Sequence, residues 1–184
     1  MKPAVFLDRD GVINYNANPH DYVKKWDEFR FYKNAVKALK DLSKRNIFTV
    51  LVTNQRGISR NIMSHEDLLD IHKNMLEELG KVNASISQIY YCSHGHEDNC
   101  NCRKPMPGMF LQAAKEHEII LEKSFMVDDA RSGIEAGKRA GCKTILVLTG
   151  NGRENLKTVD EWEFKPDYIT KDLLSATKII CKYI

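Results

Sequence analysis

The stretch of sequence that decides the fold runs from residue 4 to residue 14 and reads AVFLDRDGVIN. Its first four residues are apolar, which predicts a short buried β-strand that runs into the polar segment DRDG. Asp8 and Asp10 lie two residues apart at the end of this strand, and Gly11 allows the chain to turn away sharply. Two carboxylates so placed can share a divalent cation, or divide the roles of nucleophile and acid. This strand end is therefore a candidate catalytic centre.

Apolar runs that predict further strands alternate along the chain with segments of helical periodicity. The predicted strands cover residues 5–7, 47–52, 86–91, 124–127, 144–148 and 167–169. The predicted helices cover residues 33–44, 64–79, 107–114 and 132–140 and a last segment from residue 172. Because most of the strands are apolar throughout, this alternation is typical of a parallel sheet covered on both faces. The sequence predicts an α/β fold, a Rossmann-like three-layer sandwich with a mainly parallel central sheet.

Four of the predicted strands end in polar residues. These strand ends carry Asp8, Thr53, Cys92 and the acidic pair at 128–129. In open α/β sheets ligands bind at the carboxyl ends of the strands, so we expect these distant residues to meet at one edge.

Composition limits the class of protein. The chain has 184 residues, of which 42% are hydrophobic and 29% charged, so we expect one globular domain over residues 1–184. The net charge of +3 is too small to argue for a nucleic-acid partner. Apolar runs fall short of the ~20 residues of a membrane helix, and Asp8 follows the amino terminus too soon for a signal peptide. We expect a cytoplasmic monomer with no membrane partner.

Three of the five cysteines are crowded into one segment, residues 92–102. Cys92 and His94 form a C-x-H pair, and Cys100 and Cys102 follow as C-x-C. In a cytoplasmic chain such spacing favours a metal over a disulfide, and three thiolates with one imidazole suit a tetrahedral structural Zn²⁺. The alternatives are free buried cysteines beside an incidental histidine, or ligation by His96 in place of His94. The helix and basic stripe of a nucleic-acid-binding zinc module are absent from this sequence segment.

Four motifs together resemble those of the haloacid dehalogenase superfamily, and they occur in the family's order. They read FLDRDGVIN at 6–14, VTNQ at 52–55, CRKPMPGM at 102–109 and MVDD at 126–129. The zinc-loop pattern directly before the third motif is similar to that of the histidinol-phosphatase-like branch. The resemblance implies a nearly capless fold with a zinc loop, because the spacings between the motifs leave no room for a large cap domain.

The resemblance also implies a chemistry and a role for individual residues. Asp8 would attack phosphorus to form an aspartyl phosphate, and Asp10 would protonate the leaving alkoxide and then activate water. Thr53 would hydrogen-bond a phosphoryl oxygen, and Lys104 would neutralise the nucleophile and the transferring group. Mg²⁺ would be held by the Asp8 carboxylate, the Asp10 backbone carbonyl and Asp129.

Substrate contacts are expected in and beside the same motifs. The predicted substrate-binding residues are Arg9, Asn16, Asn54, Gln55, Arg56 and Arg103. The segment 16–19 lies where the family's loop contacts substrate. Arg56, Arg60 and Arg103 are candidates for binding a second, non-reacting phosphate. The fourth motif departs from the family, because Asp128 stands where glycine is usual and Gly133 stands where a further acid is common.

The resemblance implies hydrolysis of the 7-phosphate of a heptose 1,7-bisphosphate, supplying nucleotide-activated heptose for surface polysaccharides. A histidinol-phosphate phosphatase, or a phosphatase for another small phosphomonoester, shares every motif and stays open. A remote alternative is a non-catalytic phosphosugar-binding protein, since the extra charge of Asp128 could disturb the Mg²⁺ site.

Overall fold

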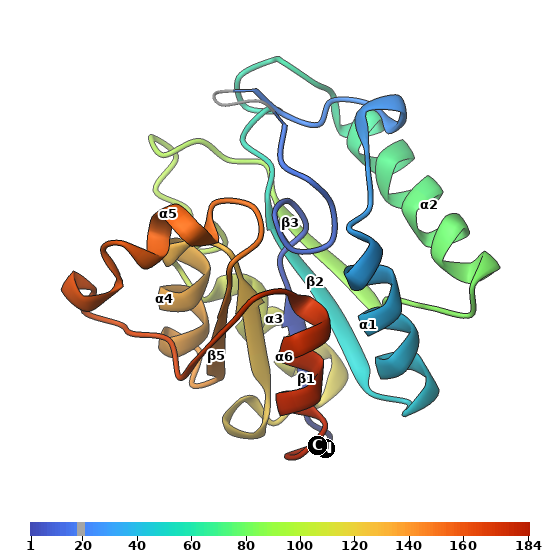
Figure 1. Ribbon diagram of the computed structural model, residues 1–184. Coiled ribbons are helices and arrows are strands. Elements are labelled where there is room, and N and C mark those ends of the chain that lie inside the picture. The colour runs from blue at the N-terminus through green and yellow to red at the C-terminus, as the bar shows by residue number, and fades with distance from the viewer. Residues whose placement is uncertain (18–20) are drawn as a thin grey trace.

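The computed structural model describes residues 1–17 and 21–184 and is built around one six-stranded sheet (Figure 1). The strand order is β3-β2-β1-β4-β5-β6, and all five pairings are parallel. The strands are β1 (Ala4–Leu7), β2 (Phe48–Asn54), β3 (Gln88–Cys92), β4 (Phe125–Asp128), β5 (Lys143–Val147) and β6 (Tyr168–Thr170). The predicted α/β fold with a parallel central sheet is confirmed.

Helices connect the strands as the periodicity predicts. They are α1 (Lys33–Lys44), α2 (His65–Lys81), α3 (Gly108–His117), α4 (Arg131–Arg139), α5 (Gly152–Leu156) and α6 (Leu173–Ile180). Three single turns of 3₁₀ helix cover Trp26–Glu28, Leu121–Lys123 and Val159–Glu161. The sequence did not predict α5 or the 3₁₀ turns, because segments of three to five residues are too short to carry an apolar stripe.

The start of α2 is fixed by a reciprocal cap. The Asp67 backbone N–H donates to Ser64 Oγ at 3.0 Å, and the Ser64 backbone N–H donates to Asp67 Oδ2 at 2.7 Å. This capping box satisfies two donors that a helix end otherwise leaves unpaired. The helix therefore begins where the sequence predicts.

Alternate residues of β1 divide the core into two layers. Val5 and Leu7 face a cluster formed with α1, α2 and α6, whereas Ala4 and Phe6 face a cluster formed with α3 and α4. Side chains of a strand point to opposite faces in turn, so a strand that is apolar throughout must be covered on both sides. Figure 1 accordingly shows α1 and α2 on one side of the sheet and α4 on the other.

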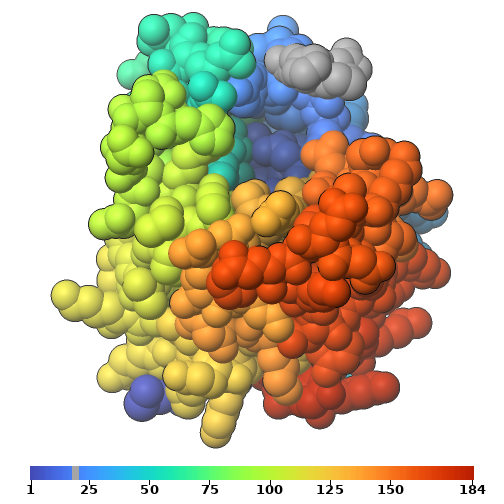
Figure 2. All heavy atoms as spheres, turned by 90° about the vertical axis from the view of Figure 1, so that its left-hand side faces the viewer, coloured from blue at the N-terminus to red at the C-terminus, as the bar shows by residue number. Residues whose placement is uncertain are grey.

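The parallel register brings the strand ends together at one edge. Leu7 pairs with Leu51 on one side and with Val127 on the other, so the residues that follow β1, β2 and β4 lie near one another. The expectation that the polar strand ends meet is confirmed. Figure 2 shows the surface hollowed over this region, with atoms of the amino-terminal segment (dark blue) visible at the bottom of the hollow. Among the described residues, every helix is too short or too polar to cross a membrane.

Candidate active site

A buried lysine lies between two carboxylates at this edge of the sheet. Lys104 Nζ is 2.9 Å from Asp8 Oδ1 and 2.7 Å from Asp128 Oδ2. Asp8 directly follows β1 and Asp128 ends the adjacent β4, while Lys104 comes from the loop after β3. Lys104 is only 4% exposed and Asp128 only 1%. Burial without these partners would be costly, so the two carboxylates fix the place of the ammonium group.

Asn54, at the end of β2, holds the backbone of Lys104. Its Nδ2 donates to the Lys104 carbonyl at 3.1 Å, and its Oδ1 accepts from the Lys104 N–H at 3.0 Å. Both ends of the amide are therefore occupied by protein. The substrate contact of Asn54 stays a prediction; in this structure the side chain holds the backbone of Lys104.

The site carries more negative charge than Lys104 can balance. One oxygen from each of Asp8, Asp128 and Asp129 lies within 4.8 Å of the others. Burial, reinforced by Asp128 and Asp10 and opposed by Lys104, raises the pKa of Asp8 to about 7. Burial and the charges of Asp128 and Asp8 also raise the pKa of Asp129 well above its usual range. Crowded, buried carboxylates of this kind fit a divalent cation with oxygen ligands.

Hydrogen bonds separate the roles of the two neighbouring acids. Asp128 uses both oxygens internally, because Oδ2 accepts from Lys104 and Oδ1 accepts from the Ala130 N–H at 2.9 Å. Asp129 Oδ2 accepts from the Asn151 N–H at 2.6 Å, and Asn16 Nδ2 lies 3.4 Å away. Within residues 1–17 and 21–184, the second oxygen of Asp129 has no hydrogen-bond donor. This difference favours Asp129 over Asp128 as the metal ligand.

Two glycines make the close approach to Asp129 possible. Gly11 and Gly150 have φ of +88° and +52°, and a Cβ on either would collide with the Asp129 carboxylate. Thr149 Oγ1 donates to the Gly11 carbonyl at 2.6 Å and so ties the loop after β5 to the first motif. The sequence analysis missed this loop, whose signal is a Thr-Gly-Asn sequence just after an apolar strand.

A third glycine makes room for Asp128. Gly133 lies in the first turns of α4, and a Cβ there would occupy the space of the Asp128 carboxylate. A side chain at residue 133 and the present position of Asp128 therefore exclude each other.

Asp10 lies in a separate hydrogen-bond network. Its carboxylate accepts from Asn14 Nδ2 at 2.8 Å and from Gln55 Nε2 at 3.0 Å, and it forms an ion pair with Arg9 Nη2 at 3.0 Å. Burial alone would raise the pKa of Asp10, but Arg9, Asn14 and Gln55 outweigh it and lower that pKa. Gln55 Nε2 also donates to Thr53 Oγ1 at 2.9 Å, which leaves the Thr53 hydroxyl proton for another acceptor.

Arg9 and Gln55 are enclosed by the protein. Arg9 is 0% exposed and Gln55 1%, and Arg9 Nη2 donates to Gln55 Oε1 at 3.3 Å. Substrate contact by these two residues stays a prediction; in this structure Arg9 contacts Asp10, and Gln55 contacts both Asp10 and Thr53.

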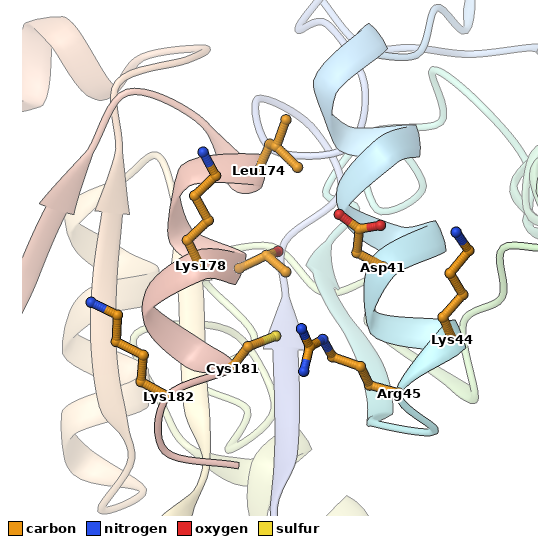
Figure 3. Close-up of a pocket in the computed structure, with 8 residues that line it drawn as sticks. Asp41, Lys44, Arg45, Leu174, Lys178, Cys181 and Lys182 are labelled. Atoms are coloured by element: carbon orange, nitrogen blue, oxygen red, sulfur yellow. The ribbon is translucent and has the colours of Figure 1, made fainter.

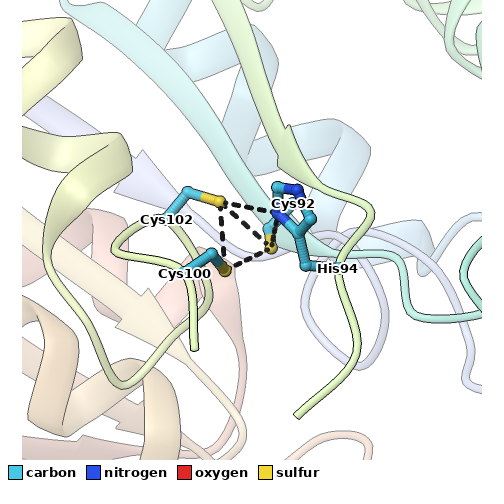
Figure 4. A group of neighbouring side chains, drawn as sticks. All are labelled: Cys92, His94, Cys100 and Cys102. Carbon is cyan, nitrogen blue, oxygen red and sulfur yellow. Dashed lines mark hydrogen bonds between the residues drawn. The ribbon is translucent and has the colours of Figure 1, made fainter. Parts of the chain in front are cut away.

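The predicted metal ligands at the end of β3 and in the loop after it form one cluster (Figure 4). Cys102 Sγ lies 3.2 Å from Cys92 Sγ, 3.4 Å from Cys100 Sγ and 3.2 Å from His94 Nδ1. These distances are far longer than the S–S bond of about 2.0 Å. They approach the ligand-to-ligand edge of about 3.8 Å that a tetrahedral Zn²⁺ with bonds of about 2.3 Å requires. His96 lies outside this cluster.

Two predicted substrate-binding arginines lie against residues 92–102, the segment called here the cysteine loop. Arg103 Nη1 donates to the His94 carbonyl at 3.2 Å, and its Nη2 lies 3.4 Å from His96 Nε2. Arg56 Nη2 lies 3.7 Å from a carboxylate oxygen of Glu97. The Nε atoms of both arginines are buried without a hydrogen-bond partner in the described structure.

Arg60 instead donates to the Tyr22 hydroxyl at 3.5 Å. Of the segment 16–19, residues 18 and 19 lie outside the described residues.

A basic pocket of about 600 Å³ lies elsewhere, between α1 and α6 (Figure 3). Its cations are Lys44, Arg45, Lys178 and Lys182. They sit at the carboxyl ends of the two helices, where positive side chains offset the negative end of the helix dipole. Helices in such a fold run opposite to the strands, so this pocket lies away from the catalytic edge.

The fold and the site together define a hydrolase with a strand-end carboxylate, a buried lysine and an acidic metal site. A family model described as HAD-hydrolase-like matches residues 101–176. A D-glycero-β-D-manno-heptose-1,7-bisphosphate 7-phosphatase from Helicobacter pylori is 41% identical over 176 residues, covering 95% of this chain and 97% of the relative. A protein of the same name from Pasteurella multocida is 37% identical, with coverage of 98% and 97%.

The crystal structure of the D,D-heptose 1,7-bisphosphate phosphatase from B. bronchiseptica, complexed with magnesium and phosphate, superposes with a TM-score of 0.91. It is 31% identical and covers 99% of each chain. The chain therefore belongs to the haloacid dehalogenase-like hydrolases, in the group that contains these heptose bisphosphate phosphatases. The predicted family and the predicted class of enzyme are confirmed.

Proposed function

We propose that this protein removes the 7-phosphate from D-glycero-β-D-manno-heptose 1,7-bisphosphate. The observation that carries the proposal is Lys104, held between Asp8 and Asp128 beside a third carboxylate. A phosphate monoester is anionic and repels nucleophiles, so a carboxylate can attack it only where cations neutralise the transferring group. The names of the similar relatives support the sugar and the anomer.

The reaction follows from the two separate positions of Asp8 and Asp10. An Asp8 oxygen forms a bond to phosphorus while the bond from phosphorus to the sugar oxygen breaks. Asp10, whose pKa is lowered in the free protein, must take up a proton before it gives that proton to the leaving sugar oxygen. Water then attacks the aspartyl phosphate, passes a proton back to Asp10, and releases phosphate with Asp8 restored. Thr53 donates its hydroxyl proton to a phosphoryl oxygen, and Lys104 balances the charge of Asp8 and of the transferring group.

The carboxylates of Asp8 and Asp129 and the backbone carbonyl of Asp10 are the residues that would hold Mg²⁺. The ion would supply positive charge against the phosphoryl oxygens. Asp128, whose oxygens are both occupied, holds Lys104 rather than the metal. In this proposal the charge of Asp128 is balanced by Lys104, so it no longer argues for a protein that binds a phosphosugar without catalysis.

The second phosphate of the substrate is the feature that separates a heptose bisphosphate from histidinol phosphate. Arg103 and Arg56, which both lie against the cysteine loop, are the proposed anchors for it. Their buried, unpartnered Nε atoms are donors that an anion could satisfy. Cys92, His94, Cys100 and Cys102 are proposed to hold a structural Zn²⁺, which would fix the loop that presents Arg103 and Lys104.

Steady-state kinetics with Mg²⁺ test the proposed substrate. We expect kcat/KM for the β-anomer of the heptose bisphosphate to exceed that for histidinol phosphate by about 100-fold or more, the equivalent of about 2.7 kcal/mol. The α-anomer is the control for the sugar configuration. A higher kcat/KM for histidinol phosphate would replace the proposed substrate by the alternative. Failure to release phosphate from any monoester would leave only a binding role.

We expect Gly133→Ala to lower kcat about tenfold or more, because the new methyl group displaces the Asp128 carboxylate that holds Lys104. Gly80→Ala is the matched control, since a Cβ at Gly80 in α2 meets nothing within 4 Å. The control should retain full activity and gain roughly 0.5–1 kcal/mol of stability. Equal kcat for the two variants, measured with the same substrate, would contradict the packing argument.

A further inference from the structure

A buried histidine of α2, His72, contacts Arg9 in the motif that carries Asp8 and Asp10. His72 is 5% exposed, and its Nε2 lies 3.5 Å from Nη1 of Arg9. Burial, together with the positive charge of Arg9, lowers the pKa of His72 to about 3. The imidazole is therefore neutral at ordinary pH. Because a guanidinium can only donate, Nε2 is the acceptor and the ring proton resides on Nδ1.

His72 fixes one end of the Arg9 guanidinium. Nη2, at the other end, contacts Asp10 and Gln55, whereas Nε has no partner in the described structure. Within the same residues, His72 is the only side chain that bonds Nη1. The guanidinium is planar and rigid, so an acceptor at Nη1 sets the direction in which Nη2 meets Asp10. Loss of that acceptor would leave a buried donor unpaired and release the rotation of the group.

We propose that His72 is a positioning residue for the acid–base step, acting through Arg9 to hold the Asp10 carboxylate toward the leaving oxygen. The inference rests on the proposed phosphatase function. It assigns His72 and Arg9 to proton transfer and leaves substrate binding and attack by Asp8 to other residues.

The choice of leaving group tests the proposal. Departure of a sugar alkoxide needs a proton from Asp10, but departure of para-nitrophenolate does not. We expect His72→Leu to lower kcat for the heptose bisphosphate by about 10–30-fold, with KM within about twofold of wild type. In stopped-flow experiments with para-nitrophenyl phosphate, the first burst of nitrophenolate should keep its wild-type rate and amplitude. Later turnovers should be slow, because Asp10 must still activate water.

Two further variants separate positioning from stability. His65→Leu is the matched control, because His65 lies two turns earlier in α2 and its ring contacts Tyr91 as that of His72 does. It should behave as wild type. His72→Gln, which offers a carbonyl oxygen near the place of Nε2, should recover kcat to within about threefold.

The proposal would be overturned if His72→Leu changed only KM, or if it lowered the burst rate as much as kcat. A reduced burst amplitude at normal rate would also overturn it, since that result reports fewer folded molecules. Wild-type protein that released no phosphate from any monoester would instead refute the proposed function.

Discussion

Replacement of Asp8 by asparagine should abolish turnover, with kcat falling on the order of 10⁴-fold or more while the fold stays intact. The amide cannot form the aspartyl phosphate, although Lys104 keeps its contact with Asp128. Wild-type protein quenched in acid during turnover should carry a covalent, alkali-labile phosphate, and Asp8→Asn protein should carry none. Asp41→Asn, an exposed aspartate of α1, is the control for the loss of one carboxylate.

The same substitution should leave the melting temperature unchanged or raise it when measured without Mg²⁺. Burial raises the pKa of Asp8 to about 7, which means that the folded state disfavours the ionised carboxylate. Asp8 therefore costs stability progressively as the pH rises from its ordinary pKa of 3.8 to about 7, the full cost remains above that pH, and asparagine carries no such charge. A phosphorylated Asp8→Asn protein, or a variant with wild-type kcat, would refute the nucleophile assignment.

The second large effect is expected at the cysteine cluster. Cys100→Ser should lose most of its zinc, because a hydroxyl is a far poorer ligand than a thiolate. If the cost is about 4 kcal/mol, the melting temperature of a chain this size should fall by about 8–16 °C. Activity should fall too, since Cys102 directly precedes Arg103 and Lys104. Elemental analysis and thermal melts measure the first two effects.

Cys181→Ser is the matched control for the cluster. Cys181 is a half-buried free cysteine outside the cluster, so this variant should keep about one zinc per chain and the wild-type melting temperature. Wild-type protein that bound no zinc, or a Cys100→Ser protein that melted like the control, would contradict the structural role of the metal.

The fold and the catalytic edge were predictable because their signals are local. An apolar strand that ends in Asp8, followed by other apolar strands with polar ends, implies a parallel sheet whose carboxyl edge gathers those residues. The spacing of Cys92, His94, Cys100 and Cys102 also implied their meeting, since Cys92 ends β3 and the other three lie in the loop that follows it. In these cases neighbouring residues carry the information.

Residues that act from inside the core were not predicted. Arg9 and Gln55 were expected to contact substrate, yet both side chains are buried, and Nη1 and Nη2 of Arg9 meet His72 and Asp10 within the protein. His72 lies on the buried, apolar face of α2. The sequence alone does not indicate that its partner is Arg9, which lies in the loop after β1. The roles of Asp128 and Asp129 likewise depend on which oxygen meets Lys104, and adjacency in sequence cannot decide that.

The contact between Asp128 and Gly133 has a consequence for how such a chain can change over generations. A side chain cannot enter at residue 133 while the Asp128 carboxylate remains, and removal of that carboxylate first deprives Lys104 of a partner. We therefore expect either single change to lower the activity of the enzyme. The two positions should be inherited as a pair, so that lineages which differ at one should differ at the other.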